Sequence, residues 1–225
     1  MNPYFKTPPL VMNLIIINVL VFMAQALLPA ETGEQLANLF ALHFTYSQFF
    51  QPWQLVTYMF MHGSWGHLFF NMFALWMFGR ILEIDLGSRR FLIFYLVCGV
   101  GAALTQLGVN WIEVALVKNG TITNPKAILA LSQADMATVG ASGAIFGVLL
   151  AFGLLHPNDR IILLFPPIPM KAKYFVIAYG VLELTFGTVN PGSSIAHFAH
   201  VGGMLWGWLL LTYWRNRVRR KKMYY

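Results

Sequence analysis

Residues 139–147 read VGASGAIFG and continue into an apolar run that ends at residue 155. Small residues recur here at helical spacing, at Gly140, Gly143, Gly147 and Ala151. Such a stripe is typical of membrane helices that pack closely against a neighbour. Ser142 lies within the stripe, so it is either a packing residue or a nucleophile. The stretch alone does not decide between these two roles.

The composition indicates a protein that spans a membrane several times. Of the 225 residues, 58% are hydrophobic and only 10% are charged, whereas a soluble domain carries about 25% charged residues. A spanning helix needs roughly 20 mostly apolar residues. The sequence therefore predicts an all-α membrane protein, a six-transmembrane-helix bundle that forms a single domain over residues 1–225. The predicted spans are residues 10–28, 67–82, 91–112, 139–155, 174–189 and 196–214.

The basic residues are distributed unevenly over the loops of this six-helix plan. Thirteen of the 15 Lys and Arg residues fall on one side of the predicted bundle, and only Lys118 and Lys126 fall on the other. Loops rich in Lys and Arg stay in the cytoplasm, so we expect both termini there, with residues 215–225 as a basic cytoplasmic tail. The net charge of +7 thus reflects topology, and we expect no nucleic-acid partner. We expect the bilayer to be a bacterial cytoplasmic (inner) membrane.

The first connection, residues 29–66, is long and rich in aromatic residues. Aromatic side chains prefer the boundary between lipid and water, so we expect this loop to lie partly at the outer interface.

The depth of Ser142 follows from its distance to the end of its span. It precedes His156 by fourteen residues, which is roughly 21 Å of helix. In a hydrocarbon core of about 30 Å, Ser142 then lies on the order of 10 Å beneath the outer surface. Non-helical backbone at that depth must be buried in protein or line a water-filled cavity. We therefore expect a hydrophilic pocket, open to the outside, around Ser142.

The last span offers a partner for Ser142. His200, Gly203 and Gly207 share one helical face, and the two glycines allow this helix to approach the small-residue stripe. His197 lies one turn closer to the outer surface and lacks this alignment. Ionisable residues inside a membrane are costly and usually line a functional cavity. A satisfied hydrogen bond between helices is the alternative for His200.

A third polar element begins the second span. His67 and Asn71 are four residues apart, so they lie on one helical face. Both can donate a hydrogen bond to a developing oxyanion. The backbone N–H of Ser142 is a further candidate, because amides at a helix start lack partners within the helix. Packing between helices is again the alternative.

Taken together, these residues resemble the rhomboid family of intramembrane serine proteases, and the resemblance covers essentially the whole chain. It implies Ser142 as nucleophile and His200 as general base, without cofactor or metal. It implies His67, Asn71 and the Ser142 amide as oxyanion donors, and Phe146 as the aromatic residue packed on the catalytic imidazole. It also implies substrates that are membrane proteins with an easily unwound transmembrane helix, cut towards the outer face. The markers are Trp53, His67-xxx-Asn71, Gly140-Ala141-Ser142-Gly143 and Ala199-His200-xx-Gly203-xxx-Gly207.

Three further polar residues lie outside the candidate catalytic set. Gln54 stands where the family often has Arg, which leaves the anchoring of the first loop open. His62 matches a frequent loop histidine, for which we expect a structural role. Glu183 is the only acidic residue within a predicted span, and no role is predicted for it. We expect no carboxylate beside His200, and hence a Ser–His dyad.

Two other classes of function remain open. A catalytically inactive rhomboid-like protein would bind membrane clients, although such relatives usually lose Ser or His and this chain keeps both. A metal-dependent membrane hydrolase or transporter would use His62, His67, His197 and His200. Zinc sites favour Cys, His and carboxylate ligands at regular spacing, and the sequence has no HExxH motif.

Overall fold

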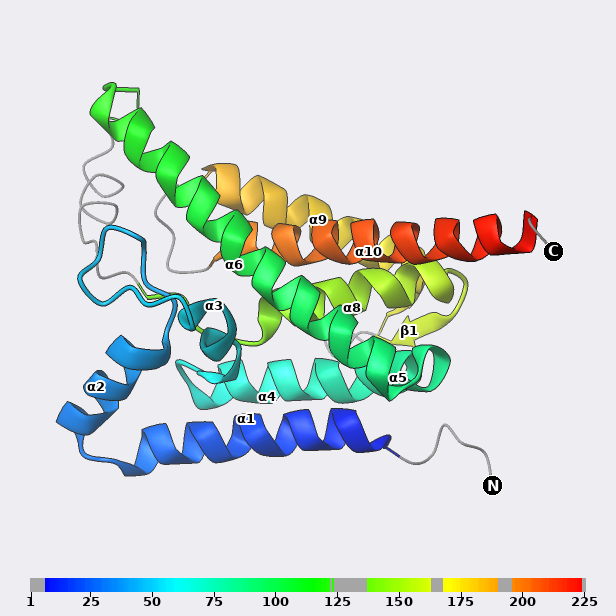
Figure 1. The fold of residues 1–225 in the computed structure, drawn as a ribbon, viewed down its shortest axis with the longest axis horizontal. Helices are drawn as coiled ribbons and strands as arrows, with labels where there is room; N and C mark the ends of the chain where they lie inside the picture. The colour runs from blue at the N-terminus through cyan, green and yellow to red at the C-terminus, as the bar shows by residue number, and fades with distance from the viewer. Residues whose placement is uncertain (1–6, 122, 124–136, 163–167, 190–195, 224–225) are drawn as a thin grey trace.

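A computed structural model describes residues 7–121, 123, 137–162, 168–189 and 196–223 of the chain, with side chains up to residue 217 in the last helix. Lys6, Lys126 and the basic side chains from residue 219 onward, which entered the charge argument, lie outside the described residues. The described part is a bundle of helices with one small sheet (Figure 1).

Helices follow one another along most of the described chain. Segments α4, η3 and α5 succeed each other without a break, so residues 65–86 form one continuous helix with a π-helical turn at η3. Strands β1 (Arg160–Ile162) and β2 (Pro169–Lys171) pair antiparallel. The helices are α1 (Pro9–Leu27), α2 (Ala30–Phe40), α3 (Gln54–Thr57), η2 (Tyr58–Phe60), α4 (Trp65–Ala74), η3 (Leu75–Gly79), α5 (Arg80–Leu86), α6 (Ser88–Lys118), α8 (Ser142–Leu155), α9 (Ala172–Val189) and α10 (His197–Met223).

Within the described ranges, three helices are long and apolar enough to cross a membrane, namely α1, α6 and α9. Helix α8 is apolar but shorter, and its 14 residues extend over about 21 Å, less than the roughly 30 Å of a hydrocarbon core. The predicted span 139–155 was therefore wrong at its start, because the backbone before Ser142 is not helical. Gly140 has φ +124°, and its N–H donates to the carbonyl of Tyr58 at 2.9 Å.

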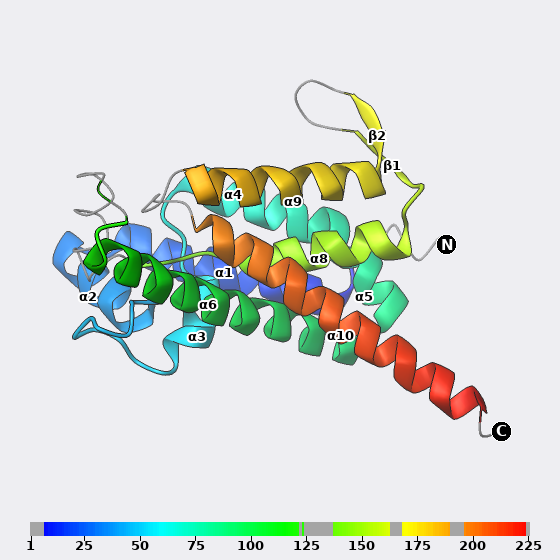
Figure 2. The same ribbon diagram turned by 90° about the horizontal axis from the view of Figure 1, so that it is seen from above.

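The arrangement of the helices places α8 inside the bundle. It packs against α6, α9 and α10 (Figure 2). Its apolar side chains are mostly buried. Helix α1 begins and α10 ends at the same end of the bundle, where α5 and β1 also lie; α2 and α3 lie at the opposite end (Figure 1). Helix α10 continues to Met223, so the predicted basic tail starts as helix.

Gln54, which stands where the family often has Arg, anchors the first loop. Its side chain is fully buried. The carboxamide oxygen accepts from the backbone N–H of His43 and of Gln51, at 3.2 and 3.1 Å. The amide nitrogen donates to the carbonyls of Asn38 and Phe49, at 3.0 and 2.8 Å. One neutral side chain thus ties the end of α2 to the turn that precedes α3.

Glu83 performs a comparable task at the other end of the bundle. Its buried carboxylate accepts from the backbone N–H of Leu10 and Val11, at 3.1 and 2.7 Å, and from the hydroxyl of Ser88 at 2.6 Å. Free N–H groups at a helix start attract negative charge. The N-terminus of α1 is therefore fixed to the junction of α5 and α6.

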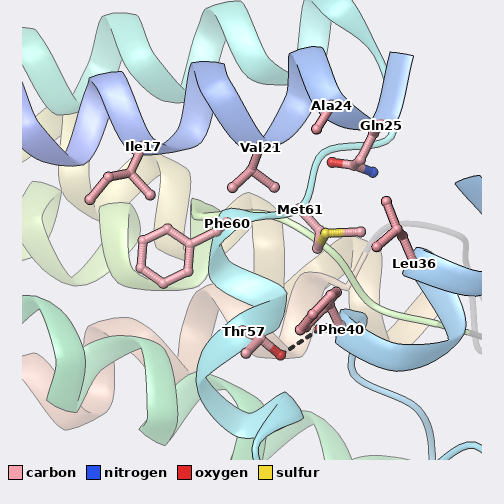
Figure 3. Close-up of a pocket in the computed structure, with 9 residues that line it drawn as sticks. All are labelled: Ile17, Val21, Ala24, Gln25, Leu36, Phe40, Thr57, Phe60 and Met61. Atoms are coloured by element: carbon pink, nitrogen blue, oxygen red, sulfur yellow. Dashed lines mark hydrogen bonds between the residues drawn. The ribbon is translucent and has the colours of Figure 1, made fainter. Parts of the chain in front are cut away.

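An apolar pocket of about 340 Å³ lies between α1, α2 and the α3–η2 segment. Figure 3 shows Ile17 and Val21 of α1 on one side and Phe40 and Phe60 on the other. No residue predicted for the functional site lines this pocket. The candidate site therefore lies elsewhere in the bundle.

Candidate active site

The backbone before Ser142 requires glycine at position 140. Its φ of +124° lies in a region that side chains disfavour. A Cβ at this position would also stand 2.7 Å from the His67 imidazole. Ser142 is the first residue of α8, so its N–H belongs to the amides that have no acceptor within the helix.

Helices α8 and α10 touch backbone to backbone. A Cβ on Gly203 would overlap the carbonyl oxygen of Gly143. A Cβ on Gly207 would lie 3.4 Å from Cα of Gly147, which itself faces Cys98 and the carbonyl of Gly203. The glycines predicted to line the two faces are therefore those at which the helices meet.

This contact brings Ser142 and His200 together. Oγ of Ser142 lies 2.8 Å from Nε2 of His200, although 58 residues separate them along the chain. The ring of Phe146, one turn beyond Ser142, stacks on the imidazole with ring centroids 4.2 Å apart and planes 5° apart. Both side chains are partly buried. The imidazole is thus held in one plane with Nε2 towards the hydroxyl.

The expectation that no carboxylate lies beside His200 is wrong. Oε2 of Glu183, in α9, lies 2.7 Å from Nδ1 of His197 and 2.9 Å from Nδ1 of His200. The first contact has the alignment of a hydrogen bond. The second has the distance but not the alignment of a hydrogen bond, so in this structure it is a close polar contact. The sequence contained an indication of this contact, because an isolated acidic residue in an apolar span, such as Glu183, usually marks a functional position.

The start of α4 carries His67 and Asn71 to the segment that leads into Ser142. Oγ of Ser64 caps this helix by accepting from the N–H of His67 at 3.1 Å. The His67 ring contacts Gly140, and Nδ2 of Asn71 lies 3.7 Å from the position of a Cβ there. This buried amide has no partner among the residues that the structure describes. A buried donor left unpaired costs free energy, which makes the Asn71 amide nitrogen a candidate donor to a bound acceptor.

His62 supports this corner of the site. Its ring meets that of His67 edge to face, with centroids 5.1 Å apart. Its backbone N–H donates to Oε1 of Gln25 at 3.2 Å, and its carbonyl accepts from Nε2 of the same residue at 3.4 Å. Burial, helped by the neighbouring His67, lowers the pKa of His62 to about 4. A neutral imidazole at physiological pH agrees with the structural role expected for this residue.

The four histidines of the metal hypothesis do not form one cluster. Within the described ranges, three side chains place possible ligand atoms within 4.8 Å of one another, and these are Glu183, His197 and His200. His62 and His67 form a separate pair.

Comparison with known proteins agrees with the geometry. Residues 50–217 match the rhomboid domain family. The chain is 31% identical to the Rhomboid protein 1, mitochondrial, of Saccharomyces cerevisiae over 97% of its own length and 58% of that protein. It is 32% identical to the RHOMBOID-like protein 12, mitochondrial, of Arabidopsis thaliana over 66% of its length and 42% of that protein. It is 25% identical to the Rhomboid protease AarA of Providencia stuartii, over 89% and 70% respectively.

The relatives differ in location and are longer than this chain. Two of these three are named as mitochondrial proteins and one is bacterial, so the comparisons do not support the bacterial inner membrane that we expected. The chain spans 58% and 42% of the length of the yeast and plant relatives.

Proposed function

Because the chain belongs to the rhomboid family and is an integral membrane protein, we propose that it is an intramembrane serine endopeptidase with Ser142 as nucleophile and His200 as general base. The observation that carries this proposal is the 2.8 Å contact between Ser142 Oγ and His200 Nε2. A serine hydroxyl is a weak nucleophile and requires an adjacent base. The stacked Phe146 ring holds that base in the productive orientation.

The proposed reaction follows from this pair. Ser142 Oγ attacks the scissile carbonyl while Nε2 of His200 takes its proton, and the imidazolium then returns a proton to the leaving amine. Water hydrolyses the acyl-enzyme with the same base. The negative oxygen of each tetrahedral intermediate is met by the Ser142 N–H, the Asn71 amide and the His67 imidazole, because donors aimed at the developing charge supply much of the catalysis.

We propose that the substrates are proteins anchored in the membrane by a helix, cut within or near the outer half of the bilayer. Ser142 begins a helix of 14 residues, which is too short to cross the hydrocarbon core, so the reacting atoms would lie below the membrane surface. A peptide bond inside a helix has its carbonyl hydrogen-bonded, and the substrate must unwind locally to present it.

The proposal includes a six-span topology with both termini in the cytoplasm. Eight described basic side chains favour this arrangement, because their segments lie at the end of the bundle where α1 begins and α10 ends (Figure 1). A reporter fused after Tyr225 is expected to be cytoplasmic, and one inserted next to Gly120 is expected to be exported. An exported C-terminus would mean an odd number of spans and a reversed site. The eight residues are Arg80, Arg89, Arg90, Arg160, Lys171, Lys173, Arg215 and Arg217.

Cleavage of a single-span substrate by the purified protein in detergent tests the proposed chemistry. We expect activity to persist in a strong chelator and to be lost with a mechanism-based inhibitor that reacts with serine, because nucleophile, base and oxyanion donors are all supplied by the chain. Activity that disappears on chelation and returns with zinc would contradict the serine mechanism. A protein that binds the substrate helix without cutting it would favour the inactive client-binding alternative.

A further inference from the structure

We propose that Glu183 is a positioning residue for His200, so that a carboxylate from α9 completes the Ser142–His200 pair. This inference rests on the proposed function. Oε2 of Glu183 lies 2.9 Å from Nδ1 of His200, the ring nitrogen on the opposite edge from the one that faces Ser142.

Burying the carboxylate of Glu183 inside the helix bundle costs free energy, so other groups must replace the water around it. It is the one acidic residue of α9, and its side chain is only 14% exposed. Removing a carboxylate from water is expensive unless charged or hydrogen-bonding partners replace the water. The two imidazoles that surround it, 10% and 11% exposed, supply these partners.

The packing of α9 on α10 brings the Glu183 carboxylate next to the two histidines of α10. Gly180, Glu183 and Gly187 share one face of α9. A Cβ on Gly187 would lie 3.2 Å from Cβ of His197, and one on Gly180 would lie 3.3 Å from Cε of Met204. The helices therefore approach closely on both sides of Glu183, which lets a short side chain reach two histidines.

An acceptor at this place favours the form of His200 that can act as a base. Nε2 of His200 can accept the Ser142 proton only when the neutral ring carries its proton on Nδ1. An Nδ1–H donor then faces Oε2 of Glu183, which favours that tautomer and stabilises the imidazolium formed during attack. The contact is close but off the line of a hydrogen bond, and catalytic hydrogen bonds often align only when substrate is bound.

His197 acts on the carboxylate and not on the nucleophile. Its Nδ1 lies 2.7 Å from the same oxygen with hydrogen-bond alignment, so it holds Glu183 in place. The same three side chains are a conceivable cation site, but the 2.7 Å separation favours a hydrogen bond. Two ligands about 2.0–2.1 Å from a tetrahedral zinc would lie roughly 3.3 Å apart.

The test compares kinetics of Glu183→Gln with those of Glu113→Gln, the same change on α6. We expect Glu183→Gln to lower kcat about 10- to 100-fold with little change in KM, the range set by losing a hydrogen bond to a charged group. Glu183→Asp should recover part of the loss, and Glu113→Gln should match wild type. Equal kcat for Glu183→Gln and wild type would overturn the proposal, as would a loss confined to KM.

A second measurement does not depend on activity. In the Ser142→Ala background, ¹⁵N chemical shifts of labelled histidine report which nitrogen of His200 carries the proton. We expect the Nδ1–H form with Glu183 present and a mixture of tautomers after Glu183→Gln. An unchanged tautomer would overturn the positioning role, and so would one equivalent of tightly bound zinc in the purified protein. A failed serine mechanism would instead appear as full activity of Ser142→Ala alone.

Discussion

We expect Ser142→Ala to eliminate cleavage of a single-span substrate, and His200→Ala to eliminate it to the same extent. Loss of a triad-type nucleophile or base costs on the order of 10⁴-fold or more in kcat, because the serine hydroxyl cannot attack without transferring its proton. The double variant should lose little more than either single one, since the two residues act as a unit. The measurement is the initial cleavage rate at matched concentrations of folded protein in detergent.

His197→Ala is the matched control, because it removes the same side chain one turn away. Its Nδ1 contacts Glu183, whereas Nε2 of His200 contacts Ser142. We expect His197→Ala to keep measurable turnover. The assignment of the base is wrong if His197→Ala is inactive while His200→Ala still cleaves.

The second large effect is expected at the oxyanion donors. Asn71→Ala removes a buried amide nitrogen that has no hydrogen-bond partner in the described part of the chain, so no hydrogen bond donated by that nitrogen to the described residues is lost. Losing one such donor costs about 10²–10³-fold in kcat. His67→Ala should fall in the same range, although its contact with Gly140 adds a packing loss. Both variants are assayed for kcat and for thermal stability.

Asn13→Ala is the control for Asn71→Ala, since Asn13 is exposed on α1. It should leave kcat unchanged. A wild-type kcat for Asn71→Ala, or an activity loss explained entirely by lower thermal stability, would remove Asn71 from the oxyanion site.

Local properties of the sequence were sufficient for the helical elements and for one helix contact. A single apolar run of about 20 residues satisfies its own backbone in lipid by forming a helix, and helices lie close to the positions of the predicted spans. Glycine at helical spacing permits close approach, and the α8–α10 contact indeed occurs at Gly143, Gly147, Gly203 and Gly207. The start of α8 was placed too early, because a positive φ at Gly140 is invisible in hydropathy.

Only the tertiary structure decided which polar side chains meet. Gln54 anchors the first loop because its amide reaches five backbone groups of that loop once it is folded. Glu183 acquired two histidine partners because α9 lies against α10. Hydropathy and spacing describe each helix by itself, whereas a hydrogen bond between helices depends on their relative rotation and depth. The composition and motifs therefore determined a helical rhomboid protein with Ser142 and His200 as candidates, and packing alone determined that a carboxylate lies between the two histidines of α10.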